Sequence, residues 1–426
     1  MDSSTTNDPK MERDCSNMVK ELLPQVDQLV ASGQLPAALD QLHALEKKTR
    51  AAADLWSTTQ LLERIVDICA HAQEWVMLEQ QVAAMAKKHA QLKQAITKMV
   101  QKAMTYLDQA AEPTRTELID GLRKVTEGKM FVEVEYARLT RMRANIYEQQ
   151  GQINKAADLL QEVQVETSMD RREKTDFILE QMRLCLAKRD FIRMAIISRK
   201  INQKYFEHEG TEDLKLRYFE LMIQYDVHEE NYLEVSRHYY AIYTMPSIKA
   251  DASKWPSMLQ NMVLYLVMAP YGNEQVDMLH RIQQDHNLET LPHSCQLVKI
   301  FTTMELTRWS VVEQNTDKQV LRDRVIEHNV RVIAKYYLRA TIQQLTRLLE
   351  LSADEVETFI SKAVVSGTIY ARIDRPAGIV TFAQPREGEE QLNAWASDVN
   401  KLLSLVEKTT HLISKEEIVN KIAQAI

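Results

Sequence analysis

The chain is poor in glycine and proline. Of its 426 residues, 9 are glycine and 10 are proline, which is about 2% of each against usual frequencies of roughly 7% and 5%. Propellers, β-sandwiches and doubly wound sheets need many turns, and turns use these two residues for their backbone geometry. The shortage therefore excludes those folds and favours helices joined by short polar turns. Apolar residues make up 45% and charged residues 27%, which indicates a globular chain.

Cysteine is scarce as well. The four cysteines, at positions 15, 69, 185 and 295, have no metal-ligand spacing and are too few to cross-link the chain. We therefore expect reduced thiols in the core of a cytoplasmic and nuclear protein. The polar N-terminus lacks the apolar run of a signal peptide. The longest apolar run, 262–270, is much shorter than the roughly 20 residues of a membrane span, so no membrane is expected.

Catalytic motifs are missing too. The chain contains no Walker A sequence, no G-x-G-x-x-G, no G-x-S-x-G and no H-E-x-x-H, and its 11 histidines form no H-x-H pair. We therefore expect neither an enzyme nor a bound metal or cofactor. The charge balance, 53 basic against 60 acidic residues with a net charge of −7, argues against nucleic acid, which attracts surplus lysine and arginine.

A turn pattern recurs along the first three quarters of the chain. Short polar turns precede an apolar or aromatic residue at positions 35, 75, 153, 191 and 232, at intervals of 40, 78, 38 and 41. The interval of 78 is two periods of 39, with the missing turn near 111–113. A period of about 40 suits one helix pair per repeat. The pattern predicts a tail over 1–17 and a right-handed α-solenoid of TPR-like helical repeats over 18–309; an irregular helical bundle is the alternative.

The pattern changes after Trp309. Residues 310–320 are polar and predict a linker, and a helix over 321–337 precedes a compact unit that ends near 385. A capping box at Ser352–Glu355 opens a helix, and Gly367 ends it. Residues 368–373 and 379–382 are rich in β-branched and aromatic side chains, which indicates two strands. Three helices followed by a small β-hairpin predict a winged helix over 321–385.

The last segment, 390–426, contains no glycine or proline. Large apolar residues recur there every seven positions in two rows, which hold Leu392, Val399, Val406 and Ile413, and Trp395 and Leu402. Heptad rows predict a long helix that packs in a coiled coil or bundle. A second capping-box pattern at 414–417 leaves open a break near residue 412.

A winged helix can bind DNA, but this one is poorly charged for it. The helix before the hairpin begins with Asp354, Glu355 and Glu357, and carboxylates at that end would repel phosphate groups. Basic residues between 322 and 339 keep DNA binding open as a remote alternative. We predict no nucleic-acid partner.

Two surfaces require a protein partner. The outer strand of a hairpin exposes unpaired backbone groups that a neighbouring strand can bind. A heptad seam needs a second helix, because a stripe of large apolar side chains is unstable in water; packing against the chain's own solenoid is the alternative. The predicted interface residues are Thr368, Ile369, Tyr370, Ile373, Ile379 and Phe382 at the winged-helix edge, and Leu392, Trp395, Val399, Leu402, Val406 and Ile413 along the C-terminal helix.

This order of solenoid, winged helix and terminal helix resembles the PCI family, a scaffold module of the proteasome lid, the COP9 signalosome and a translation initiation factor complex. Strings at 91–95, 125–140, 177–187, 301–309, 327–337 and 408–417 are similar to those of proteasome-lid members. The Glu-His-Asn string at 327–329 is shared with a COP9 signalosome subunit, so a scaffold of that complex is the alternative. The linker at 310–320 is shorter than the family pattern.

The resemblance implies a non-catalytic scaffold of the lid of the 19S regulatory particle of the 26S proteasome, acting in ubiquitin-dependent protein degradation. It implies that the winged helix packs beside those of other lid PCI subunits and that the terminal helix joins a helical bundle. It also implies that the solenoid reaches toward the ATPase ring and the core particle, and that the subunit lies beside the metalloprotease deubiquitinase. The expected state is a hetero-oligomer.

Overall fold

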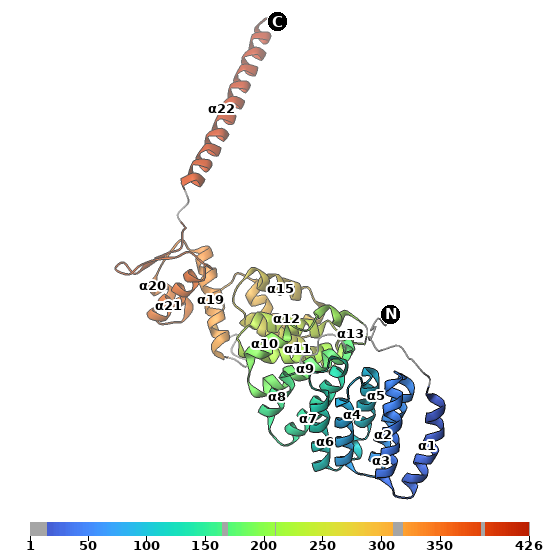
Figure 1. The fold of residues 1–426 in the computed structure, drawn as a ribbon. Helices are drawn as coiled ribbons and strands as arrows, with labels where there is room; N and C mark the ends of the chain where they lie inside the picture. The colour runs from blue at the N-terminus through green and yellow to red at the C-terminus, as the bar shows by residue number, and fades with distance from the viewer. Residues whose placement is uncertain (1–14, 164–168, 209, 310–317, 385–387, 426) are drawn as a thin grey trace. The chain divides into compact units, whose positions relative to one another are not determined.

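The computed structural model describes residues 15–163, 169–208, 210–309, 318–384 and 388–425. Most of them lie in helices, with one small sheet (Figure 1), which confirms the expected fold class. The chain forms two compact units that divide between Glu229 and Glu230, inside the region that the sequence predicts as one solenoid. The first helix begins at Ser16, two residues before the expected start.

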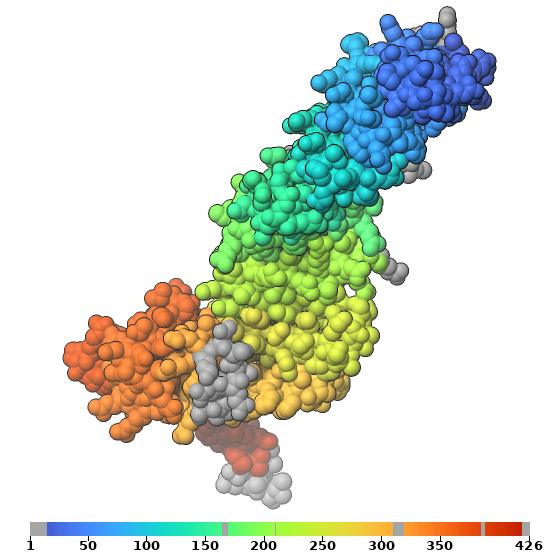
Figure 2. Space-filling view, turned by 90° about the horizontal axis from the view of Figure 1, so that it is seen from below, coloured from blue at the N-terminus to red at the C-terminus, as the bar shows by residue number. Residues whose placement is uncertain are grey.

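The first unit consists of helices in consecutive pairs, and Figure 2 shows its blue-to-green surface as continuous. The second helices of four pairs, α2, α4, α8 and α10, begin at the positions that the repeat predicts. Helix α6 begins at Glu112, where the turn missing from the repeat was expected near 111–113. The elements are α1 (Ser16–Ala31), α2 (Leu35–Ala51), α3 (Leu55–His71), α4 (Trp75–Lys87), α5 (Lys93–Thr105), η1 (Leu107–Gln109), α6 (Glu112–Thr126), η2 (Met130–Val132), α7 (Glu133–Gln149), α8 (Ile153–Gln161), α9 (Arg171–Lys188), α10 (Phe191–Ser198), η3 (Gln203–Glu207) and α11 (Glu212–His228).

The turns inside four of these pairs share one backbone geometry. After α1, Gly33 has a φ of +78°, and its N–H and the next N–H donate to carbonyl groups in the last turn of α1. This Schellman arrangement satisfies carbonyls that the helix end leaves unpaired. The same geometry closes α3, α7 and α9, at Gln73, Gly151 and Arg189. The left-handed residue therefore fixes where one helix stops and its antiparallel partner starts.

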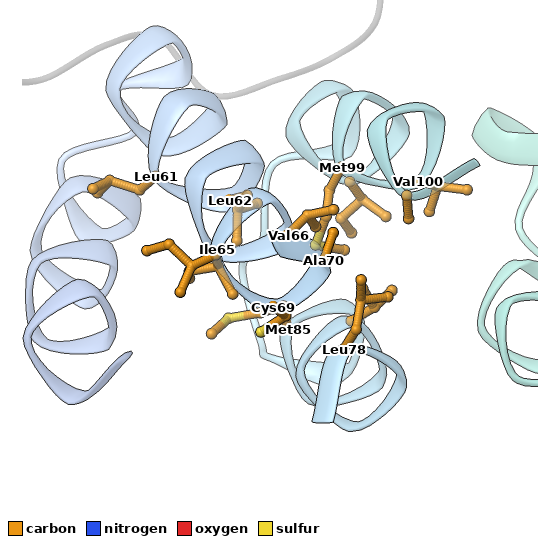
Figure 3. Close-up of a cluster of buried hydrophobic side chains, with 14 of the residues drawn as sticks. Leu61, Leu62, Ile65, Val66, Cys69, Ala70, Leu78, Met85, Met99 and Val100 are labelled. Atoms are coloured by element: carbon orange, nitrogen blue, oxygen red, sulfur yellow. The ribbon is translucent and has the colours of Figure 1, made fainter. Parts of the chain in front are cut away.

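Buried side chains of neighbouring pairs form the core of this unit. Helix α3 packs against α2, α4 and α5, and its Leu61 and Leu62 have no exposed surface. Figure 3 shows them in one cluster with Met85 of α4 and Met99 of α5. Full burial of one such side chain contributes about 1.5–3 kcal/mol. Each helix pair is thus stabilised by contacts with the next pair, as in repeat proteins.

Ion pairs join the first helices of three successive pairs. Asp176 of α9 accepts hydrogen bonds from Arg141 of α7 at 2.6 Å and from Arg217 of α11 at 3.1 Å. Arg183 of α9 donates two bonds of 2.6 Å to the carboxylate of Glu148 on α7. Two-pronged arginine–carboxylate pairs are directional as well as strong, so this ladder sets the register of α7, α9 and α11.

The second unit continues with helices and ends in the sheet and a long helix. Residues 310–317 of the predicted linker lie outside the described ranges, and the helix after them begins at Lys318. The elements are α12 (Tyr232–Tyr243), α13 (Pro246–Ala250), α14 (Trp255–Met268), α15 (Asn273–Gln283), α16 (His286–Glu289), α17 (Pro292–Thr302), α19 (Lys318–Tyr336), β1 (Arg339–Thr341), α20 (Ile342–Leu349), α21 (Ala353–Val365), β2 (Arg372–Asp374), β3 (Ile379–Thr381) and α22 (Gly388–Ala425).

Helices α19, α20 and α21 and the sheet form the predicted winged helix around one apolar core. Ile333, Leu345, Ile360 and Val380 are each 1% exposed within it. The predicted capping box is present at the start of α21, where Ser352 and Glu355 bond to each other's backbone N–H. Gly367 has a φ of +71° just beyond the end of α21, as a C-cap requires.

Helix α19 also holds the extended segment that follows α17. The side-chain carbonyl of Asn329 accepts from the N–H of Thr307 at 3.0 Å, and its amide donates to the carbonyl of Thr307 at 2.8 Å. His328, which is 2% exposed, lies against Phe301, with the ring centroids 5.3 Å apart and the ring planes tilted by 57°. The Glu-His-Asn string at 327–329 therefore has a local structural role. His328 contacts the last turn of α17, and Asn329 binds the segment that follows it.

Candidate assembly surfaces

The described residues offer little for catalysis. They contain no group of three or more histidine, cysteine, aspartate or glutamate side chains placed to hold a metal ion. Burial raises the pKa of the Cys69 thiol to about 11 and also raises that of Cys185. A thiol must ionise to act as a nucleophile, so both are inert at neutral pH. In the described ranges, no helix is both long and apolar enough to cross a bilayer.

The sheet of the winged helix has two free edges. Its strand order is β1-β3-β2, and both pairings are antiparallel. In the register, Val380 of β3 lies opposite Ala340 of β1 on one side and Ile373 of β2 on the other. The predicted hairpin is therefore present as β2 and β3, with an unpredicted third strand beside it. Backbone groups for a partner strand are available on β1 and β2, because β3 is paired on both sides.

The structure separates the six predicted edge residues into different environments. Ile373 lies in the edge strand β2, whereas Ile379 lies in the central strand β3. Phe382 is 6% exposed and belongs to the winged-helix core, so its side chain is not available to a partner. Thr368 and Ile369 are half-buried, and Tyr370 is exposed, in the segment that leads to β2. Contacts between these residues and a partner remain a prediction. Tyr370 and the backbone of β2 are the parts of the set best placed to make them.

The other edge, β1, was missed by the sequence reasoning. Leu338, just before β1, is 74% exposed, while its carbonyl accepts from the N–H of Phe382 at 2.9 Å. Tyr336 and Tyr337 are also exposed. The capping box of Thr341 and Gln344 could have revealed this strand in the sequence. It marks the start of α20, so the residues between it and the end of α19 must be extended.

Helix α22 carries the second predicted surface. It runs unbroken through 414–417, so the break near 412 that the capping-box pattern left open does not occur. Its 38 residues span about 57 Å at 1.5 Å per residue. Five of the six predicted seam residues are more than half exposed and Val399 is half-buried; the five are Leu392, Trp395, Leu402, Val406 and Ile413.

The apolar surface of α22 widens along the helix. At 100° per residue, Leu392, Trp395, Val399 and Leu402 occupy an arc of roughly 80°, which is the width of a single seam. Further on, the exposed apolar residues Leu403, Leu405, Leu412, Ile418 and Val419 extend it to an arc of roughly 260°. A two-stranded coiled coil covers only the a and d positions. The second half of α22 therefore suits a bundle in which more than one helix packs against it.

Three family models match the chain, and together they cover most of it. The model described as "PSMD12/CSN4, N-terminal" matches residues 37–251. The "PCI domain" model matches 275–384, which includes the whole winged helix and helices before it. The model described as "26S proteasome regulatory subunit RPN5 C-terminal domain" matches 390–421, which lies within α22.

Curated relatives match over nearly their whole length. The "26S proteasome regulatory subunit RPN5" of Saccharomyces cerevisiae is 43% identical over 434 aligned residues, covering 96% of this chain and 97% of the relative. The chain belongs to this family of 26S proteasome regulatory subunits. The "26S proteasome non-ATPase regulatory subunit 12" of Dictyostelium discoideum is 39% identical, with 99% and 98% covered. The homologue A of that subunit in Arabidopsis thaliana is 41% identical, with 92% and 99% covered.

Membership of the proteasome regulatory-subunit family distinguishes between the two scaffolds considered from the sequence. The relatives reported above are named as proteasome subunits, and so is the model that matches α22. The COP9 signalosome alternative is therefore not favoured. The match on 390–421 also falls on α22, whose large apolar side chains are exposed.

Proposed function

We propose that this chain is a non-catalytic scaffold subunit of the lid of the 26S proteasome regulatory particle, acting in ubiquitin-dependent protein degradation. The observation that carries the proposal is the match of α22 to a proteasome-specific C-terminal model on a helix whose large apolar side chains are exposed. An exposed apolar stripe of this length requires a partner, and the relatives are named as parts of a many-subunit assembly.

The two surfaces have different parts in this scaffold. Helix α22 joins a bundle formed with the terminal helices of other lid subunits. The free edges β1 and β2 extend the sheet toward neighbouring winged helices, since unpaired backbone groups at a sheet edge can bind another strand. The first unit, with its regular helix pairs, is the rigid arm that reaches the ATPase ring and the core particle.

The role of the chain is positional. By joining the lid bundle and its neighbours, it holds the metalloprotease deubiquitinase in register with the ATPase ring and the core particle. It takes no cofactor and binds neither nucleic acid nor membrane. It resides in the cytoplasm and the nucleus as part of a hetero-oligomer.

The decisive experiment changes the seam of α22 without changing its length. Leu402→Asp together with Val406→Asp places two carboxylates in the apolar arc, one helical turn apart. We expect the variant to fold as wild type does, because both side chains are more than half exposed, but to fail to enter the lid. Co-expression with the other lid subunits, followed by native mass spectrometry of the purified complex, measures incorporation.

A matched control adds the same charges to the opposite face of the helix. Asn400→Asp together with Ser404→Asp has the same spacing and the same charge change, and both residues are exposed. This control should enter the lid normally. If the seam variant assembles as well as the control does, α22 is not the bundle element. If the wild-type chain purifies with cullin-deneddylating subunits instead of ATPases, the lid assignment itself is overturned.

A further inference from the structure

One helix of the first unit exposes two large apolar side chains between cations. Ile192 of α10 is 78% exposed and Ile196 is 57% exposed. They are four residues apart and so lie side by side on one face of the helix. The opposite face is buried through Met194 and Ile197. The exposed isoleucines are therefore not needed for packing within this unit.

A basic cavity lies just beyond the C-terminal end of α10. Lys200 follows Ile196 by four residues and lines a cavity of about 360 Å³, together with Arg171, Lys174 and Lys204. The cavity lies where the start of α9 meets the segment that contains η3. No aspartate or glutamate is among the described residues that line it.

Three of these cations make no ion pair with a carboxylate of the described ranges. Among the described residues, no ion pair is made by Arg171, Lys200 or Lys204. On the other flank of α10, by contrast, Asp158 pairs with Lys188 at 2.5 Å and with Arg193 at 3.7 Å. The chain as a whole carries a net charge of −7, so the charge of the cavity is opposite in sign to that of the whole protein. Such a local concentration of charge attracts anionic groups selectively.

We propose that this region, here named the α10 surface (Ile192, Ile196, Arg171, Lys200 and Lys204), binds an acidic amphipathic helix of a partner protein. Two apolar side chains spaced by one helical turn cover Ile192 and Ile196, and carboxylates next to them enter the basic cavity. Removing the two isoleucines from water favours binding, and the opposite charges orient the partner helix and speed its association.

The apolar pair distinguishes this occupant from a nucleic acid. Phosphate groups could enter the cavity, but bases stack on aromatic rings and arginine planes, and Ile192 and Ile196 offer neither. The inference rests on the first unit alone. It is therefore independent of the role of α22 and of the proposed place in the proteasome lid.

Fluorescence anisotropy with the full-length chain tests the proposal. The probe is a fluorescein-labelled synthetic helix with two leucines one turn apart and a run of four glutamates beyond them. A second peptide carries the glutamates before the leucines, and a third replaces them with glutamines. We expect one of the two acidic peptides to bind and the glutamine peptide to bind at least tenfold more weakly.

Variants assign the binding to residues. Lys200→Glu with Lys204→Glu, and separately Ile192→Ser with Ile196→Ser, should each weaken acidic-peptide binding about tenfold, the change produced by losing roughly 1.4 kcal/mol. The control is Lys47→Glu with Lys48→Glu, the same charge change at two exposed lysines of α2 in the same unit. It should change binding less than twofold, and circular dichroism should show equal helix content in all variants.

Three results would overturn the proposal. The first is that no peptide binds at millimolar concentration. The second is that the Lys47/Lys48 control weakens binding as much as the cavity variant does, which indicates attraction to overall charge. The third is that polyuridylic acid or vesicles containing phosphatidylserine bind tightly and show the same dependence on Lys200 and Lys204 but none on Ile192 and Ile196, which indicates a phosphate site.

Discussion

Lowering the pH from 7 to 5 should destabilise the second unit through one buried histidine. His328 of α19 is 2% exposed, and burial lowers its pKa from the usual 6.5 to about 4. The charge of Arg331 acts in the same direction, while hydrogen bonds with the backbone of Glu305 and Thr303 oppose it. The folded protein therefore keeps this imidazole neutral at a pH where the unfolded chain protonates it.

The sign and size of the effect follow from this difference. The contribution of His328 to stability is fully present above pH 6.5 and is lost as the pH falls toward 4, because the unfolded state takes up the proton first. For pKa values of 6.5 and about 4, linkage predicts a loss of about 2 kcal/mol between pH 7 and pH 5 from this group alone.

The variant His328→Gln isolates the contribution. It removes the titrating group and the ring near Phe301, so it should be less stable than wild type at pH 7. At pH 5 the deficit should shrink by about 2 kcal/mol, because only the wild type then carries the protonation cost. Urea unfolding followed by far-UV circular dichroism at both pH values measures the four free energies of unfolding.

The difference between the two proteins cancels all other titrating groups. The control His411→Gln removes an imidazole from the exposed surface of α22 and should not change stability at pH 7. A deficit of His328→Gln that is the same at pH 7 and pH 5 would refute the reasoning, since it would mean that His328 titrates equally in the folded and unfolded chain.

Two further predictions concern the turns and the clamp on α19. Gln73 has a φ of +56°, so Gln73→Gly should raise the free energy of unfolding of the first unit by about 0.5–1 kcal/mol. The control Gln80→Gly, in the interior of α4, should lower it by about 1 kcal/mol. The two variants should therefore shift the thermal midpoint in opposite directions, and equal shifts would contradict this prediction. Asn329→Asp keeps the acceptor for the N–H of Thr307 but loses the donor to its carbonyl at a site 5% exposed. It should cost about 2–4 kcal/mol and speed hydrogen exchange over 303–308, and unchanged exchange there would contradict the clamp.

Local signals in the sequence located several helix ends. The repeat spacing predicted a turn near 73 without a glycine, and the structure has Gln73 in the left-handed conformation there. The box at Ser352–Glu355 likewise marks the start of α21. These features were predictable because the groups that satisfy a helix terminus are neighbours in sequence.

Two of the errors arose where distant residues decide, and one arose where a local pattern is ambiguous. Strand β1 has only three residues, which is too short for its alternation of exposed and buried side chains to stand out in the sequence. It forms because β3, about 40 positions further along the chain, pairs with its backbone. The pattern at 414–417 is that of a capping box, yet it lies inside α22, since serine and glutamate are also tolerated within a helix. Phe382 was expected at an interface because its strand was expected at an edge, but it is core.

The sequence by itself determined the helical class, the length of the repeat, the winged helix and the heptad rows of α22. All of these depend on periodicity and on contacts within a few residues of each other. Only the tertiary structure decided that β3 is the central strand, that Phe382 belongs to the winged-helix core, and that Lys200 and Lys204 line one cavity with Arg171 of α9. Those features depend on which distant segments meet, and side-chain packing across the fold determines that.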